Sequence, residues 1–185
     1  MASASDPVKP EIHPTSILAP GAVAIGQVTI ERDCFIGPNC VLRGDIEPIV
    51  VERGSNLQDN VTVHTHKGSP VTVGQNVSVG HGAVLHGGVL EPWCLVGMNA
   101  VVLDHAVVGE RSVVGALSLV PAGFKVPPRS LAVGIPCKVV KQNDLRIAQM
   151  AEENAKRYHV YREEYLDGRW RTVVGPHNDG GVFGR

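Results

Sequence analysis

Four of the eight histidines in this chain stand close together, since His64, His66, His81 and His86 fall within 23 residues. Neutral imidazole is the commonest zinc ligand, and three histidines with one open position define the catalytic type of zinc site. His64, His81 and His86 are therefore candidate metal ligands, for zinc first and for iron or cobalt as alternatives. A histidine at a turn is more often a hydrogen-bonded surface residue, and that interpretation stays open for each of them.

A second group of polar residues precedes these histidines, in the segment that contains Arg43, Asp45, Asn56, Gln58 and Asp59. An arginine beside two aspartates can form a bidentate, partly buried pair, so this trio is expected to hold a subunit interface in register. The two amides would offer neutral donors and acceptors near the metal. The alternative is a turn-capping network whose role is limited to shape.

The elements that must position these residues are indicated by a repeat of six. Aliphatic residues recur at this interval, and a mostly small residue follows each of them by four positions; the aliphatic set is Val96, Val102, Val108, Val114, Val120 and Val126. A period of six matches neither a helix nor an isolated strand and is typical of a repeated strand-and-turn unit. Three such units close one triangular coil of about 18 residues. Residues 15–140 are therefore predicted to form an all-β solenoid, with one residue of the repeat dropped near Glu91 and Pro92.

The repeat also predicts where the histidines stand. His81 and His86 are five residues apart and should occupy adjacent edges of one coil, while His64 precedes His81 by 17 residues and should share its corner. Because His81 and His86 need not converge within one chain, we expect a homotrimer in which ligands from two chains meet at a seam. His66 lies in a polar stretch and is interpreted as a solvated loop residue.

The pattern changes after the array. Asn143 and Asp144 can cap a helix at 143–167, whose apolar or small residues are spaced by three and four at Leu145, Ala148, Ala151, Ala155, Tyr158, Tyr161 and Tyr165. This stripe is expected to lie on the flank of the solenoid or of a neighbouring subunit. Residues 1–14 are predicted to be an N-terminal extension and residues 168–185 a flexible tail.

Composition excludes several classes of protein. With 185 residues, 43% hydrophobic and 4% aromatic, the chain is expected to form one domain with an aliphatic core. A formal charge of −1 argues against nucleic acid and acidic membranes as partners. No long apolar run or export signal occurs, so a cytoplasmic protein is expected. The four scattered cysteines are interpreted as buried free thiols.

The chain resembles the γ-class carbonic anhydrases over about residues 12–167. The motifs that carry the resemblance are RGD at 43–45, SNLQDN at 55–60 with VTVH ending at His64, and VGHGAVLHG at 79–87. The resemblance implies a left-handed parallel β-helix with a C-terminal helix, assembled as a trimer. It also implies that His64 and His86 of one chain and His81 of the next bind zinc, and that Arg43, Asp45 and Asp59 form the inter-subunit salt bridges.

The function implied by the resemblance is reversible hydration of carbon dioxide to bicarbonate by a metal-bound hydroxide. Gln58 would orient the substrate or the hydroxide, with Asn56 close by. This chain has Ile46 after RGD and a short loop after His64 in place of the glutamates that shuttle protons in some relatives, so it resembles the subgroup without an acidic loop. His66 and Tyr158 are the candidate substitute proton shuttles, and low activity is expected.

Two other functions stay open. Hexapeptide arrays also occur in acyltransferases that use coenzyme A, and a related site could hydrolyse an acyl thioester. A catalytic histidine outside the triple, or a long substrate loop, would favour this second class, and the sequence indicates neither. The third class is a non-catalytic assembly subunit, which would be expected to lose one or more of the ligands that this chain retains.

Overall fold

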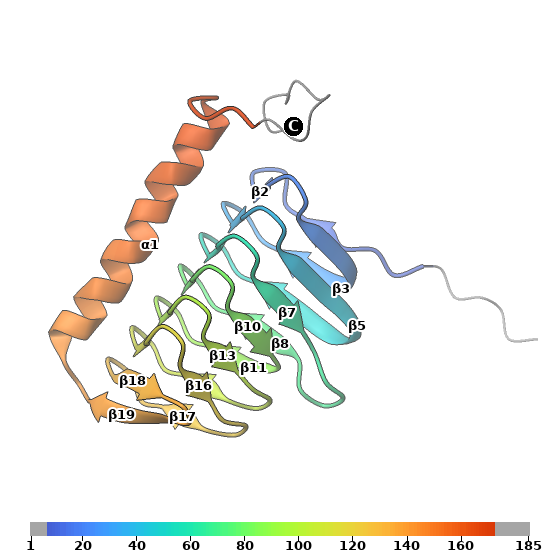
Figure 1. Ribbon diagram of the computed structural model, residues 1–185. Helices are drawn as coiled ribbons and strands as arrows, with labels where there is room; N and C mark the ends of the chain where they lie inside the picture. Colours follow the sequence, from blue (N-terminus) through green and yellow to red (C-terminus); the bar gives the residue numbers. More distant parts are fainter. Residues whose placement is uncertain (1–6, 173–185) are drawn as a thin grey trace, which may run out of the picture.

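The structure, a computed structural model, describes residues 7–172; residues 173–185, most of the predicted flexible tail, lie outside the described residues. Short parallel strands stack into a left-handed β-helix with three faces, and a single long helix runs along it (Figure 1). The predicted fold class, a solenoid of hexapeptide repeats with a C-terminal helix, is confirmed.

The first face carries the candidate histidines His64 and His86. Its strands are β3 (Val23–Ile30), β5 (Val41–Val51), β7 (Thr62–His64), β10 (Val84–His86), β13 (Val101–Val102) and β16 (Leu119–Val120). Strands β3 and β5 are long enough to turn a corner, because their first halves pair on this face and their second halves on the next.

The second and third faces complete each coil. The second face is built from the ends of β3 and β5 together with β1 (Glu11–Ile12), β8 (Val71–Val73), β11 (Gly88–Leu90), β14 (Val107–Val108) and β17 (Lys125–Val126). The third face consists of β2 (Ile17–Leu18), β4 (Phe35–Ile36), β6 (Asn56–Leu57), β9 (Ser78–Val79), β12 (Leu95–Val96), β15 (Val113–Val114), β18 (Leu131–Gly134) and the antiparallel β19 (Cys137–Lys141).

The core is the aliphatic column that the repeat predicts. All six valines of the hexad series are buried, with exposed fractions of 0–2%, and the small residues Ala100, Ala106 and Ser112 are buried at the turns between them. Alternate residues of a strand point to opposite faces of the sheet, so each short strand contributes one residue to the interior and its neighbours to the surface. Stacking of successive coils therefore produces one continuous core.

The missing residue of the repeat lies earlier than the prediction near Glu91 and Pro92. The interior positions Leu85 and Leu90 are five residues apart, and the chain turns between them at Gly87 and Gly88, whose φ angles are +83° and +94°. A Cβ on Gly87 would lie 2.2 Å from Ser69 Oγ, and one on Gly88 would lie 2.6 Å from the Ala106 carbonyl oxygen. Two glycines in the left-handed region turn this corner in fewer residues than the other corners need.

The helix α1 (Leu145–Leu166) starts beside the last coil and runs back to the first (Figure 1). It begins at Asp144, whose side chain accepts a hydrogen bond from the Arg146 backbone N–H at 2.9 Å, as an N-cap does. It packs on the third face against β9, β12 and β15. No helix among residues 7–172 is long and apolar enough to cross a membrane.

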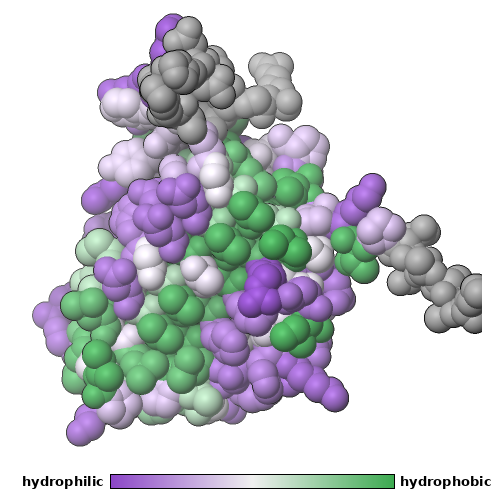
Figure 2. Space-filling model, turned by 45° about the vertical axis from the view of Figure 1, so that its right-hand side comes forward, coloured by the Kyte–Doolittle hydropathy of each residue, from purple (hydrophilic) through white to green (hydrophobic). Residues whose placement is uncertain are grey.

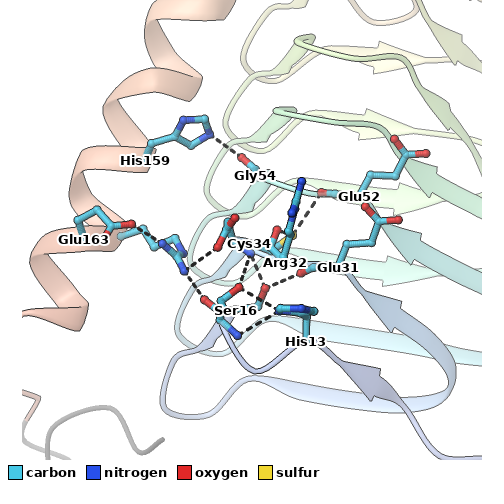
Figure 3. Close-up of polar contacts among 12 residues, drawn as sticks. His13, Ser16, Glu31, Arg32, Cys34, Glu52, Gly54, His159 and Glu163 are labelled. Atoms are coloured by element: carbon cyan, nitrogen blue, oxygen red, sulfur yellow. Dashed lines mark hydrogen bonds and ion pairs between the residues drawn. The ribbon is translucent and has the colours of Figure 1, made fainter.

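The buried stripe of α1 differs in part from the predicted one. Ala148, Ala151 and Ala155 are buried as expected, whereas Leu145 is 73% exposed and Ile147 takes its place against the third face. At the far end the buried residue is Arg162, which donates to the Thr15 carbonyl and lies 3.2 Å from Asp33. His159 Nε2 donates to the Gly54 carbonyl at 2.9 Å, so polar contacts fasten this end of the helix to the first coils (Figure 3).

Candidate functional site

His64 and His86 lie on neighbouring coils of the first face. They are paired in register between β7 and β10, and their ring centroids are 5.3 Å apart. The sequence spacing had predicted that His64 shares a corner with His81, and this prediction is wrong. Thr62 and Val84 are aligned although they are 22 residues apart, because the loop at 65–70 lengthens this coil beyond the 18 residues that separate Val101 from Leu119.

A carboxylate faces one ring nitrogen of each paired histidine. His64 Nε2 lies 3.1 Å from Asp45 Oδ1, and His86 Nδ1 lies 3.4 Å from Asp104 Oδ1. Asp104 was not among the residues predicted from the sequence, although it stands 18 residues after His86, one coil away. Among the described residues, its Oδ1 atom is buried without a hydrogen-bond partner. Carboxylates in this position orient imidazoles that ligate a metal.

Arg43 belongs to the same column of side chains. It is aligned with His64 between β5 and β7, and its Nη1 lies 2.6 Å from Asp45 Oδ2. This hydrogen bond is the main cause that holds the pKa of the Asp45 carboxyl below its usual value; partial desolvation opposes it and His64 adds to it. Within one chain Asp59 contacts His81 instead, with 3.2 Å between its Oδ2 and His81 Nδ1. The inter-subunit network of Arg43, Asp45 and Asp59 stays a prediction.

His66 stands beside the paired histidines on the loop at 65–70. Its ring centroid is 6.4 Å from that of His86. The loop is closed by a hydrogen bond of 2.7 Å from the Ser69 N–H to the His66 carbonyl, and by one of 2.8 Å from the Gly68 N–H to Glu47. His66 is exposed, as a solvated loop residue should be, but it is also held next to the candidate site.

His81 lies at another edge of the chain, in the turn after β9. Its backbone N–H donates to Gln58 Oε1 at 3.3 Å, and Gln58 Nε2 donates to Asn56 Oδ1 at 3.3 Å. Both amides are buried, so they fasten the turn that carries His81. Tyr158 lines the same cavity as His81, and burial, followed by the charge of Asp59, raises the pKa of its phenol to about 12.

A single chain supplies two of the three predicted metal ligands together. Within residues 7–172 of one chain, no group of three His, Cys, Asp or Glu side chains is arranged to hold a metal ion. His64 and His86 nevertheless fit a shared site, because each leans one ring nitrogen toward a carboxylate and has its other ring nitrogen for a further bond. That His81 of a second copy supplies the third imidazole stays a prediction.

Comparison with known proteins gives the family. The hexapeptide repeat of succinyl-transferase matches residues 27–64 and 70–104. The carnitine operon protein CaiE of Escherichia fergusonii is 39% identical over 168 residues, which cover 91% of this chain and 82% of CaiE. The chain belongs to the CaiE family of hexapeptide-repeat proteins.

Solved structures of similar proteins have the same fold as this chain. A hexapeptide transferase family protein from Anaplasma phagocytophilum has a TM-score of 0.81 and 34% identity, covering 86% of this chain and 94% of its own. A Bacillus cereus protein provisionally named an acetyltransferase has a TM-score of 0.83 and 32% identity, covering 86% of this chain and 93% of its own.

These similarities correct the predicted function of this CaiE-family chain. Membership of the hexapeptide-repeat proteins is confirmed, but the assignment to zinc-dependent hydration of carbon dioxide is wrong, since the similar proteins carry the names of a carnitine operon protein and of transferases. The resemblance to the γ-class carbonic anhydrases rested on motifs that build the coils and place the histidines. Such motifs specify the scaffold and not the reaction that it supports.

Proposed function

We propose that this protein transfers an acyl group from a thioester donor to a hydroxyl or amine acceptor at the corner occupied by His64, His66 and His86. The observation that carries the proposal is the grouping of three imidazoles from two strands and one loop, with centroid distances of 5.3 and 6.4 Å. The sequence indicated no catalytic histidine outside the predicted ligand triple, but the exposed ring of His66 lies 6.4 Å from that of His86, and a reactive histidine at this position would favour an acyltransferase. The similar transferases support the same class.

The acceptor oxygen or nitrogen attacks the thioester carbonyl carbon, a C–O or C–N bond forms, and the C–S bond breaks. The proton lost by the acceptor ends on the departing thiol. His66 is exposed on its loop and stands beside the pair, so we assign to it the transfer of this proton. The contact with Asp45 at 3.1 Å holds the ring of His64 in place, and the Asp104 carboxylate lies 3.4 Å from the ring of His86.

His64 and His86, with His81 of a second copy, are the residues that would hold a zinc ion, with iron or cobalt as alternatives. A metal bound there would act as a Lewis acid toward the thioester carbonyl. We expect about one ion per chain, because each seam of a ring of identical subunits is equivalent. Mass-spectrometric metal analysis after loading and desalting should show this content in the parent protein and its loss in His86→Ala.

The surface around these histidines supports a seam between copies. The column next to them on the first face points outward and is almost wholly apolar: Val23, Val41, Thr62, Val84, Val101 and Leu119. All of these side chains are partly or fully exposed in one chain. In the view of Figure 2, hydrophobic surface runs down the molecule beside hydrophilic surface. A second copy would cover such a face.

The test follows free thiol with a thiol-reactive dye when the purified protein is mixed with acetyl-coenzyme A. The acceptors are a panel of hydroxyl and amine compounds that includes carnitine, because the relatives are named for a carnitine operon. We expect thiol release that depends on an acceptor, and at least about a 100-fold loss in His64→Ala. His66→Ala should lower kcat and be rescued by added imidazole, while His105→Asn, an exposed turn histidine, should be unaffected. Release that is independent of any acceptor would show hydrolysis instead of transfer.

A further inference from the structure

Aromatic residues are scarce in this chain, yet they gather at one cavity. Only eight residues are Phe, Tyr or Trp. Five of them, including all three tyrosines, line a cavity of about 400 Å³ between α1 and the edge of the third face: Phe35, Tyr158, Tyr161, Tyr165 and Trp170. The sequence pattern had placed the tyrosines on a stripe for packing, but Tyr161 is 41% exposed and Trp170 is 47% exposed. Tyr161 and Trp170 are therefore partly open to solvent, whereas Phe35 is buried.

The rings that line the cavity also contact one another. The ring centroids of Phe35 and Tyr165 are 5.3 Å apart, and those of Tyr158 and Tyr161 are 5.5 Å apart with an interplanar angle of 80°. Phe35 is also 6.2 Å from Tyr158 and links the two pairs. Each aromatic ring carries a negative π face, so a cavity lined by several rings suits a cation.

The charged residue of the cavity lining is an anion. Asp59 lines the cavity together with the aromatic rings and His81, and no lysine or arginine belongs to the lining. Asp59 Oδ2 lies 3.2 Å from His81 Nδ1, and the Asp59 side chain is 46% exposed, so its carboxylate is partly open to solvent. One ring at the rim already receives a cation, since the guanidinium carbon of Arg169 lies 5.1 Å from the centroid of Trp170. An aromatic wall with one carboxylate is the combination that recognises quaternary ammonium groups.

We propose that this cavity binds a small organic cation of the quaternary ammonium class. Methylated ammonium offers no N–H to a hydrogen-bonding site, so π faces and a single carboxylate suit it better than a polar pocket would. Because His81 lines the cavity and is also the residue assigned to the seam, the cation would be held beside the reaction centre. Resting on the proposed function, the inference makes an acyl acceptor with a quaternary ammonium group the substrate class.

Calorimetric titration with choline and tetramethylammonium, without any thioester, tests the cavity by itself. We expect both cations to bind, and the neutral isostere of choline, in which carbon replaces nitrogen, to bind at least about tenfold more weakly. Tyr161→Leu should weaken choline binding by about tenfold, whereas Tyr161→Phe should retain it. Val160→Leu, an exposed position on the same helix, is the matched control and should leave binding unchanged.

Equal binding of choline and its neutral isostere would overturn the inference, and so would unchanged choline binding in Tyr161→Leu or the absence of binding by either cation. Circular dichroism of each variant confirms that α1 is intact. The two proposals fail separately. Cation binding without acceptor-dependent thiol release would refute acyl transfer alone, while thiol release from acceptors without cation binding would refute the cation site alone.

Discussion

Burial separates the side chains that can react from those that only support the fold. Cys34, Cys40, Cys94 and Cys137 are all buried free thiols, as their positions among repeat residues predicted. Desolvation is the main cause that raises the pKa of Cys34 and Cys40 to about 11, and it raises the pKa of Cys94 and Cys137 as well. At neutral pH none of them is a thiolate, so acyl transfer through a cysteine is not available to this chain.

The burial of the four cysteines predicts that the native protein does not react with thiol reagents. Native protein at pH 8 should release no chromophore from Ellman's reagent over minutes, because the reagent needs an accessible thiolate. In denaturant all four cysteines should react. The comparison also calibrates the thiol-release assay, since the enzyme itself should contribute no background. One equivalent of fast reaction in the native protein would show that a cysteine is accessible and reopen the covalent route.

Among the elements, the regular ones were predictable and the irregular ones were not. The hexad valines identified the coils because each coil repeats the same interior contact, and the spacing of small residues on 143–167 identified the helix. The alignment of His64 with His86 depended on the loop at 65–70, whose extra residues lengthen one coil without changing the hexad pattern on either side. The contribution of Asp104 and the cavity formed by the tyrosines both required knowing which elements lie side by side.

The attachment of α1 gives a prediction at this scale. Arg162→Met keeps the volume of the side chain but removes its contacts with the Thr15 carbonyl and Asp33. The free energy of unfolding should fall by about 1–3 kcal/mol, the lower part of this range being favoured because Asp33 is half exposed. Thermal melting followed by circular dichroism measures the effect. Arg157→Met, an exposed position on the same helix, is the control; equal melting of the two variants would mean that Arg162 contributes nothing to docking.

For the whole molecule, the predicted metal ligands lie at two separate places on one chain, and this separation predicts an oligomer. His64 and His86 are together on the first face, while His81 is fastened by Gln58 at another edge, so one chain cannot complete the triple. In such an oligomer the first face of one copy would contact the His81 edge of the next. Repeating this contact by a rotation that closes gives a ring, in which the apolar column on the first face is covered. Sedimentation should then report a mass of about three chains of 19.7 kDa.

Mixing two inactive variants tests the assembly and the site together. His81→Ala and His64→Ala proteins should each lose metal and acyl transfer, because each lacks one ligand at every seam. After exchange of subunits at equal concentrations, a seam is complete only where a His81→Ala chain supplies His64 and His86 and a His64→Ala chain supplies His81, which random mixing gives at about one quarter of the seams. Metal content and thiol release should therefore both recover to about a quarter of the parent values. A stable monomer that binds metal, or a mixture that stays as inactive as its components, would exclude a site built from two chains.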